Sequence, residues 1–364
     1  MKKLCIGIAV FCLSNPSAWA WEIHKNLMPW VVRGLSAETL KAIENPFKPQ
    51  EQGMQNENTL SHLIMELQLN PKTKLDPLNA THAREILLSG AVDEPDHGMD
   101  ENLEDSADPR NDRAYMGGKT GPTSKGFRHM FFAGWNLAHP IRSFQIPPRP
   151  LGLAPERAEI LAKKARFLLQ IENRAWGFRV LTWAMHFIQD LSQPFHSTQI
   201  PSLEIPLWSA LLGGFGNLVK ESTRTVANFH WAYEGYVNTQ VLKGDRSPFA
   251  DCLTRAKNYA SIKVNRAEIH PRELADAISA ASVELAPTVG DSVVEFFGAK
   301  LKNPEYDLPK DKGTPDYEKL SVDPTLAKQR QKLEQVTCVA LANGVMGSRL
   351  LLDWAIQAVL KTNR

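Results

Sequence analysis

The chain has 364 residues, of which 43% are hydrophobic and 23% charged, and its formal net charge is +2. These fractions are those of an ordinary globular protein, so they exclude collagen-like and intrinsically disordered classes. The near-balance of charge argues against a protein that coats nucleic acid, because such binding depends on neutralising phosphates with lysine and arginine. The length allows one large domain or two ordinary ones.

The first 20 residues have the features of a secretory signal peptide. Two lysines precede an apolar stretch, 4–13, that is too short to span a bilayer, and Ala18-Trp19-Ala20 is typical of a cleavage site. We therefore predict that residues 1–20 are removed and that residues 21–364 form a secreted protein, periplasmic or extracellular. The leader contains two lysines and no acid, so 40 basic and 40 acidic residues remain after cleavage.

Cleavage also removes two of the four cysteines and leaves Cys252 and Cys338. In an oxidising compartment these two residues can form a disulfide. Two separate buried thiols are the alternative, and the sequence does not decide between them.

Along the mature chain, apolar spacing predicts helices and little else. Helical segments are expected from about His24, at 60–69, 79–88, 156–173, 174–191 and 229–236, at 274–301 with a break at Pro287, and at 325–361. The stretches between them, such as 93–112, 140–155 and 303–324, are acidic or rich in proline. We find no convincing strand alternation, no repeat and no second apolar core beyond a linker. The predicted fold is all-α, with a single multi-helix domain.

One block, His186-Phe-Ile-Gln-Asp190-Leu-Ser-Gln-Pro194-Phe-His196, closes the apolar run 176–185. His186 and Asp190 are four residues apart, so on a helix they share one face. Pro194 ends the helix and lets His196 turn back toward the same space. Two imidazoles and a carboxylate in an apolar surround suit a divalent transition metal, zinc first. A helix with two ordinary core histidines is the alternative.

Further candidate ligands lie on both sides of this block. His230 and Glu234 form a second pair with helical spacing, and Asp93 and His129 flank apolar helical ends. After cleavage, Trp21 would offer its α-amino group and its carbonyl as a chelating pair. Each signal is weak alone. In chain order the candidates are Trp21, His24, Asp93, His129, His186, Asp190, His196, His230 and Glu234.

This order resembles the ligand set of the zinc-dependent phospholipase C family and of the related single-strand-specific nucleases. In that family the mature chain begins at a tryptophan that binds zinc, and a block of the form His-Phe/Tyr-x-x-Asp-x-x-Gln-Pro-x-His follows. The resemblance runs from Trp21 to about Tyr236, and residues 342–356 look like the closing helix of the family. It implies an all-α domain around a trinuclear zinc site.

The resemblance also implies how the three zinc ions are held. One zinc would be held by Asp93, His129, His186 and Asp190. The second would be held by His196, His230 and Glu234. The third would be held by Trp21, His24 and again Asp190, which would bridge. Zinc would activate a water molecule that attacks phosphorus, and Asp93 would orient or deprotonate that water.

The chain departs from the family pattern in three places. The gap from Asp93 to His129 is longer than expected, so Asp96 or His97 is an alternative in those roles. His24 lies unusually close to Trp21, and the segment that follows His196 is enlarged.

Two features favour lipid as the substrate. Glu234 matches the phospholipases, whereas the nucleases tend to have aspartate there. The apolar segment 205–215, within the longer insert 204–217, would rest at a bilayer interface, or alternatively pack on the core. The resemblance thus implies a phosphoric diester hydrolase that cleaves glycerophospholipids, phosphatidylcholine first, to diacylglycerol and a phosphorylated head group. Its partner would be a membrane surface, with no stable nucleic-acid partner.

Three alternatives remain open. The first is a zinc-dependent single-strand nuclease or 3'-nucleotidase of the same fold. The second is a secreted zinc-binding protein without turnover. The third is a helical structural protein whose histidines are incidental, and it predicts no bound metal.

Overall fold

The computed structural model describes residues 23–48, 51, 57–77, 79–97, 99, 128–133, 135–137, 144–146, 150–198, 225–266, 268–303, 305–306, 308 and 315–362. The predicted signal peptide, Trp21 and the segment 204–217 lie outside these residues. Most of the described residues are helical and belong to a single helical domain, which confirms the predicted all-α class.

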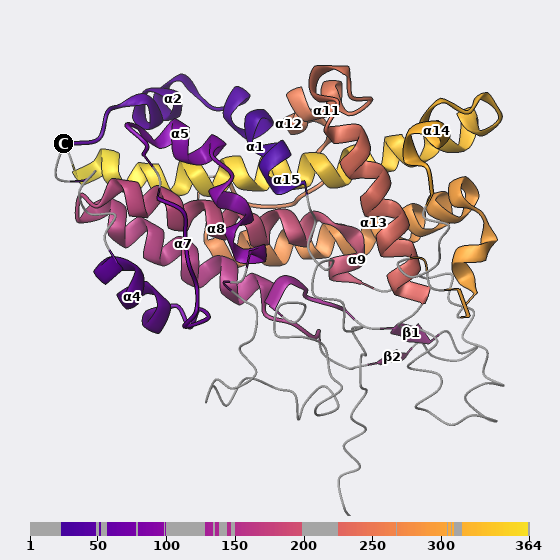
Figure 1. Cartoon of the computed structure of the whole chain (residues 1–364), viewed down its shortest axis with the longest axis horizontal. Helices are drawn as coiled ribbons and strands as arrows, with labels where there is room; N and C mark the ends of the chain where they lie inside the picture. Colours follow the sequence, from indigo (N-terminus) through magenta and orange to yellow (C-terminus); the bar gives the residue numbers. More distant parts are fainter. Residues whose placement is uncertain are drawn as a thin grey trace, which may run out of the picture.

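The core is built from four long helices. They are α7 (Ala154–Gln170), α8 (Arg174–Ser192), α13 (Pro271–Phe297) and α15 (Ala327–Thr362). In Figure 1, α15, α8 and α7 run side by side along the long axis, and α13 packs against all three. Every residue of α8 from Ala175 to Ser192 is buried. This burial explains why α8 has no face rich in exposed charged residues, since a helix surrounded by others has no solvent face.

The predicted break at Pro287 is wrong, because α13 continues through this residue to Phe297. Proline removes one backbone hydrogen bond and crowds the preceding turn of a helix. Here apolar residues on both sides of it, such as Ile278 and Val293, are fully buried in the core. Their burial outweighs the local cost, so tertiary packing overrides the local helix-breaking tendency.

Shorter helices cover the long ones. The helices α1 (His24–Arg33) and α2 (Ala37–Glu44) pack against α15, whereas α5 (Ala83–Leu88) and the 3-10 helix η1 (Ala91–Asp96) pack against α8. The helix α4 (Glu57–Glu66) lies near α7 in Figure 1. Residues 225–241 are helical. The remaining short elements are α9 (Pro194–Ser197), η4 (Gly244–Arg246), α11 (Ala250–Thr254), α12 (Ala256–Tyr259), η5 (Ala299–Lys302), α14 (Tyr317–Val322) and η6 (Pro324–Leu326).

Two short strands were not predicted. β1 (Trp135–Leu137) and β2 (Phe144–Ile146) pair antiparallel, with Trp135 opposite Ile146. Strands of three residues are too short for hydrophobic alternation to be recognised in the sequence. This ribbon leaves the helical class of the domain unchanged.

A disulfide joins Cys252 of α11 to Cys338 of α15. Of the two states that the sequence left open, the paired one is therefore present. The bond ties a short peripheral helix to the longest helix of the core.

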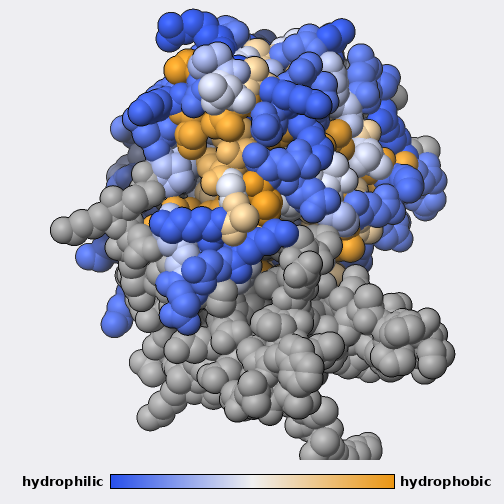
Figure 2. Space-filling view, turned by 90° about the vertical axis from the view of Figure 1, so that its right-hand side faces the viewer, coloured by the Kyte–Doolittle hydropathy of each residue, from blue (hydrophilic) through white to orange (hydrophobic). Residues whose placement is uncertain are grey.

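Figure 2 shows one end of the molecule, where hydrophilic side chains of the described residues, in blue, surround apolar areas in orange. One helical stretch, 324–357, is long and apolar enough to cross a membrane, but 78% of its most apolar window is buried inside the protein. This stretch is therefore buried to the extent typical of a helix in the core of a protein.

Candidate metal centre

The central block lies where α8 ends. His186 and Asp190 are both fully buried on the last turns of this helix. The helix ends at Ser192, and Pro194 begins the short helix α9. The side chain of Gln193 caps α9 by accepting a hydrogen bond from the backbone N–H of Phe195. This turn brings His196 back, so that its Nδ1 lies 3.2 Å from Asp190 Oδ1. The predicted reversal after the helix is confirmed.

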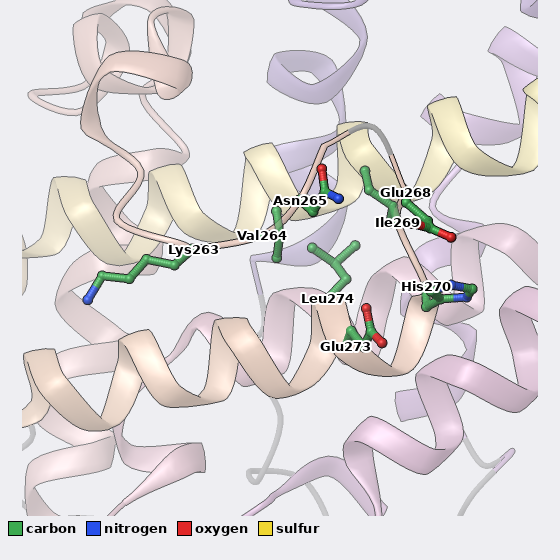
Figure 3. A pocket seen from close by; sticks show the side chains of 8 residues that line it. All are labelled: Lys263, Val264, Asn265, Glu268, Ile269, His270, Glu273 and Leu274. Carbon is green, nitrogen blue, oxygen red and sulfur yellow. The ribbon is translucent and has the colours of Figure 1, made fainter.

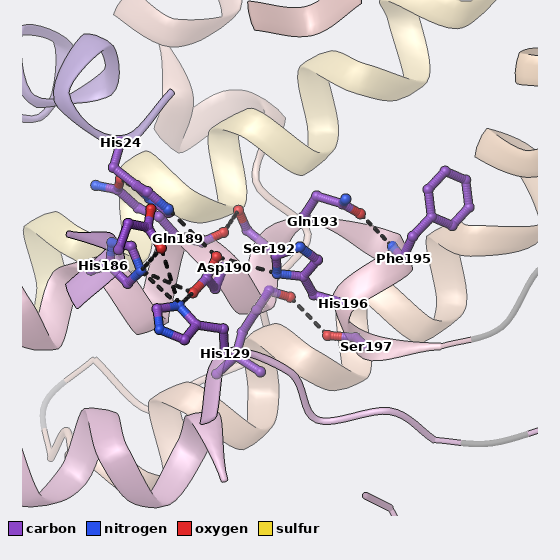
Figure 4. A network of polar contacts seen from close by, with 12 residues as sticks. His24, His129, His186, Gln189, Asp190, Ser192, Gln193, Phe195, His196 and Ser197 are labelled. Atoms are coloured by element: carbon purple, nitrogen blue, oxygen red, sulfur yellow. Dashed lines mark hydrogen bonds and ion pairs between the residues drawn. The ribbon is translucent and has the colours of Figure 1, made fainter. Parts of the chain in front are cut away.

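Asp190 is surrounded by four imidazoles, as Figure 4 shows. Its Oδ2 atom lies 2.8 Å from His129 Nδ1 and 3.2 Å from His186 Nε2. Its Oδ1 atom lies 3.2 Å from His196 Nδ1 and 3.5 Å from His24 Nε2. One buried carboxylate thus faces two pairs of histidines with its two oxygens, which is the arrangement a bridging ligand needs.

The second predicted pair meets the block from the helical segment 225–241. His230 Nε2 lies 3.1 Å from Glu234 Oε1 and 3.2 Å from His196 Nε2. His196 Nε2 in turn lies 3.9 Å from the same glutamate oxygen. His196 therefore points one ring nitrogen at Asp190 and the other at the His230 and Glu234 pair.

Three adjoining groups of side chains can hold metal ions. Within each group, one ligand atom per residue lies within 4.8 Å of the others. The groups are His24 with His186 and Asp190; Asp96 with His129 and His186; and His196 with His230 and Glu234. Imidazole and carboxylate are ligands that divalent transition metals prefer in proteins.

The polar atoms of the centre support this interpretation. His24 Nε2, Asp190 Oδ1, His196 Nδ1 and Glu234 Oε1 are buried and make no hydrogen bond within the described part of the chain. A buried polar atom that lacks a hydrogen bond costs about 1–3 kcal/mol. His24 Nε2 and His196 Nδ1 both face Asp190 Oδ1, whereas Glu234 Oε1 lies beside the Nε2 atoms of His196 and His230. Cations bound on both sides of His196 would satisfy these atoms. The donor set present therefore fits a metal.

The His186 ring is oriented from behind by the backbone of η1. His186 Nδ1 lies 2.9 Å from the carbonyl oxygen of Val92. Because a carbonyl oxygen only accepts, Nδ1 must donate, which leaves the Nε2 lone pair directed at Asp190. This is the protonation state of a metal-binding histidine.

The charges in the centre shift three pKa values. Burial by itself raises the pKa of Asp190, but the charge of His186 and the contacts with His129 lower it well below its ordinary value. Burial lowers the pKa of His24, yet its contact with the Asp190 carboxylate outweighs burial and raises this pKa. Burial and the charge of His24 lower the pKa of His186, which favours the neutral ring that metals bind.

Asp93 belongs to none of the metal-binding groups among the described residues. Its Oδ1 atom accepts a hydrogen bond of 3.1 Å from the backbone N–H of Lys25, and so caps the start of α1 from outside. Asp96, at the end of the same 3-10 helix, lies 3.6 Å from His186 Nε2 and 3.7 Å from His129 Nδ1. Asp96, one of the two alternatives, is therefore the carboxylate that lies with His129 and His186, and the assignment of the metal ligand stays a prediction.

Of the other predicted ligands, His24 begins α1 and reaches Asp190, as described above. His97, the second alternative, belongs to none of the metal-binding groups among the described residues. Trp21 lies outside the described part of the chain, so its predicted role stays a prediction.

One residue that supports the centre, Glu94, was not predicted from the sequence. Glu94 of η1 receives hydrogen bonds from Arg179 Nε at 2.9 Å and from Trp183 Nε1 at 2.6 Å, and it forms an ion pair with the same arginine. These contacts fasten η1, which carries Asp96, to α8. The only hint in the sequence was Arg179, a charged residue within the mostly apolar run 175–185.

A second polar hollow lies away from this centre. The pocket in Figure 3 is lined by residues of the 263–274 segment, including Glu268, His270 and Glu273. None of these three belongs to a metal-binding group among the described residues. The candidate centre is therefore the one around Asp190.

Comparison with family models, with curated proteins and with solved structures finds no match for this chain.

Proposed function

We propose that this protein is a secreted zinc-dependent phospholipase C, a hydrolase of the phosphodiester bond of glycerophospholipids. The observation that carries the proposal is the pair of contacts on each side of Asp190, whose two oxygens face different histidines inside a buried cluster. A structural aspartate would be expected to pair with one basic partner. A carboxylate shared between neighbouring groups is instead suited to hold two ions side by side.

Three zinc ions are proposed. One would be held by Asp96, His129, His186 and Asp190, and one by His196, His230 and Glu234. The third would be held by His24 and Asp190, with the amine and carbonyl of Trp21 once the signal peptide is removed. Zinc bound there would supply Lewis acidity and an activated water molecule for attack on phosphorus.

The residues of the chain then have separate tasks. Asp190 joins the His24 group to the His129 group, and His196 links it to the His230 group. Asp96, the less buried of the two carboxylates near His129, is the residue proposed to orient the attacking water. Glu234, together with the apolar segment 205–215, is the basis for proposing phosphatidylcholine rather than nucleic acid as the substrate.

The test is to purify the chain from Trp21 onward, measure its zinc content, and assay phosphatidylcholine against single-stranded DNA with and without a chelator. We expect release of phosphocholine that the chelator abolishes. Asp190→Asn should lose zinc and activity together. Asp245→Asn is the matched control, because this aspartate is an exposed partner of Arg33.

The other functions predict different results. Cleavage of DNA alone would identify a nuclease and refute the lipid assignment. Bound zinc without any phosphodiesterase activity would identify a zinc-binding protein. A protein without bound metal would refute the proposal altogether.

A further inference from the structure

One buried amide touches the centre without being a candidate ligand. Gln189 precedes Asp190 on α8 and is fully buried. Its Oε1 atom lies 3.0 Å from His24 Nδ1, and its Nε2 atom lies 3.1 Å from Ser348 Oγ on α15. Figure 4 shows the His24, Gln189 and Asp190 side chains gathered at the end of α8. The amide thus joins α1 to α15 through α8.

The direction of these hydrogen bonds is determined from the α15 side. The Ser348 hydroxyl lies 2.9 Å from the carbonyl oxygen of Gly344 and donates to it, since a carbonyl only accepts. Its own oxygen is then an acceptor, which requires the NH₂ group of Gln189 to face it. A second weak acceptor, Met28 Sδ, lies 3.5 Å from the same nitrogen. Both contacts orient the amide with its oxygen toward His24.

This orientation determines which nitrogen of His24 carries the proton. Because the amide oxygen only accepts, His24 Nδ1 must donate, and in the neutral ring Nε2 is left as a bare lone pair. Nε2 is the atom that lies 3.5 Å from Asp190 Oδ1 and makes no hydrogen bond within the described residues. The ring is therefore prepared to bind a cation through Nε2 on the Asp190 side.

The hydrogen bonds that run from the Gly344 carbonyl through Ser348 and Gln189 to His24, here called the relay, require α15 to lie close to α8. A Cβ atom on Gly344 would come within 2.6 Å of Ser192 Oγ, so the absence of a side chain permits this approach. Ser348 lies one turn further along the same helix and is fully buried. The remote C-terminal helix thus contributes to the centre without providing a ligand.

We infer that Gln189 and Ser348 are positioning residues that hold His24 in the Nδ1–H tautomer, so that its Nε2 atom binds metal. The Gly344 carbonyl of α15, which can only accept, determines the direction of every hydrogen bond in the relay. This inference rests on the proposed function for the identity of the ion, but not for the tautomer, which is a property of the neutral His24 ring and is measured without metal. Groups behind a metal ligand typically contribute 10- to 100-fold to metal affinity.

The first experiment measures the tautomer directly. Protein with ¹⁵N-labelled histidine is studied without metal at alkaline pH, and long-range ¹⁵N–¹H correlations show which ring nitrogen is protonated. The chain has ten histidines, so the His24 signals are assigned with His24→Gln. We expect the Nδ1–H form in the wild type and a mixture of forms in Gln189→Met and Ser348→Ala. Gln189→Glu should keep the Nδ1–H form, because a carboxylate also accepts.

The second experiment measures zinc affinity by competition with a chelator. Gln189→Met and Ser348→Ala should lower the affinity for one zinc ion by about 10- to 100-fold and leave the affinity for the other ions unchanged. Ser292→Ala is the matched control, because this buried serine donates to the carbonyl of Thr288 within α13, in the same helical pattern. It should change neither the affinity nor the tautomer.

Two results would overturn the inference. One is a wild-type His24 protonated on Nε2, and this result does not depend on how well any variant folds. The other is wild-type zinc affinity in both Gln189→Met and Ser348→Ala. If the wild type bound no zinc but showed the Nδ1–H tautomer, the proposed function would fail and the relay would stand.

Discussion

At the residue scale, two acids in one short 3-10 helix have separate environments. Asp93 accepts a hydrogen bond from the first turn of α1, whereas Asp96 faces His129 and His186. They lie three positions apart in the sequence, and both lie next to apolar residues. Spacing alone could not assign their roles, because these depend on which neighbour each carboxylate meets.

This difference gives a paired prediction. Asp96→Asn should lower zinc affinity at least about tenfold, because it removes a charged oxygen from the His129 group. Asp93→Asn should bind zinc as the wild type does and keep its stability, since asparagine caps helices as well as aspartate. Chelator competition and thermal unfolding measure both effects. Zinc loss in Asp93→Asn alone would restore Asp93 as the ligand.

The depressed pKa of Asp190 predicts a pH effect in the metal-free protein. The charges of His186 and His129 hold this pKa well below the ordinary value in the folded state. Below about pH 4 the unfolded chain takes up a proton that the folded chain refuses, so the stabilisation present at higher pH is lost. Wild type should therefore lose stability more steeply than Asp190→Asn as the pH falls below this value. Urea unfolding in the presence of chelator tests this, and parallel curves would contradict it.

At the element scale, η1 is held in place by a polar clamp. Glu94 accepts hydrogen bonds from Arg179 and Trp183, and Arg179 also donates to the carbonyl of Asp76 at 2.8 Å. The same 3-10 helix supplies the Val92 carbonyl to His186 and the Asp96 carboxylate to the centre. The clamp therefore positions two groups that touch the centre.

Weakening the clamp should affect stability and one metal group together. Glu94→Gln should lower the free energy of unfolding by about 1.5–3 kcal/mol, the usual value for hydrogen bonds to charged groups. The same substitution should also lower the zinc affinity of the Asp96 group more than that of the His230 group. The control is Glu295→Gln, which breaks an exposed pair with Lys332 and should cost less than about 1 kcal/mol. Equal loss at both groups would show a general loss of structure instead.

At the scale of the whole molecule, the centre joins helices that are far apart in the chain. Ligand atoms come from α1, η1, the segment 128–133, α8, α9 and the segment 225–241, and α15 supports them from behind. Bound metal should thus stabilise the packing of most of the domain.

Removing metal should accordingly lower the stability of the entire protein. An ion present at 1,000 times its dissociation constant stabilises the folded state by about 4 kcal/mol, provided that it binds only the folded chain. Chelation should therefore lower Tm in a single cooperative transition, and added zinc should restore it whereas magnesium should not. An unchanged Tm would support the view that the histidines are incidental.

Much of the fold could be read from local pattern. The 3.6-residue spacing of apolar side chains predicted α7, α8 and α15 close to their observed ends. The break expected at Pro287 was wrong because proline's local penalty was smaller than the packing around α13. The strands β1 and β2 were missed because they are too short to show alternation.

The sequence by itself determined the pairs His186 with Asp190 and His230 with Glu234, because residues four apart on a helix must share a face. It also predicted the return of His196 after Pro194. Only the tertiary structure chose Asp96 over Asp93, joined Cys252 to Cys338, and brought Gln189 between His24 and Ser348. The reason is physical: contacts within one helix follow from its geometry, whereas contacts between distant segments depend on how the helices pack.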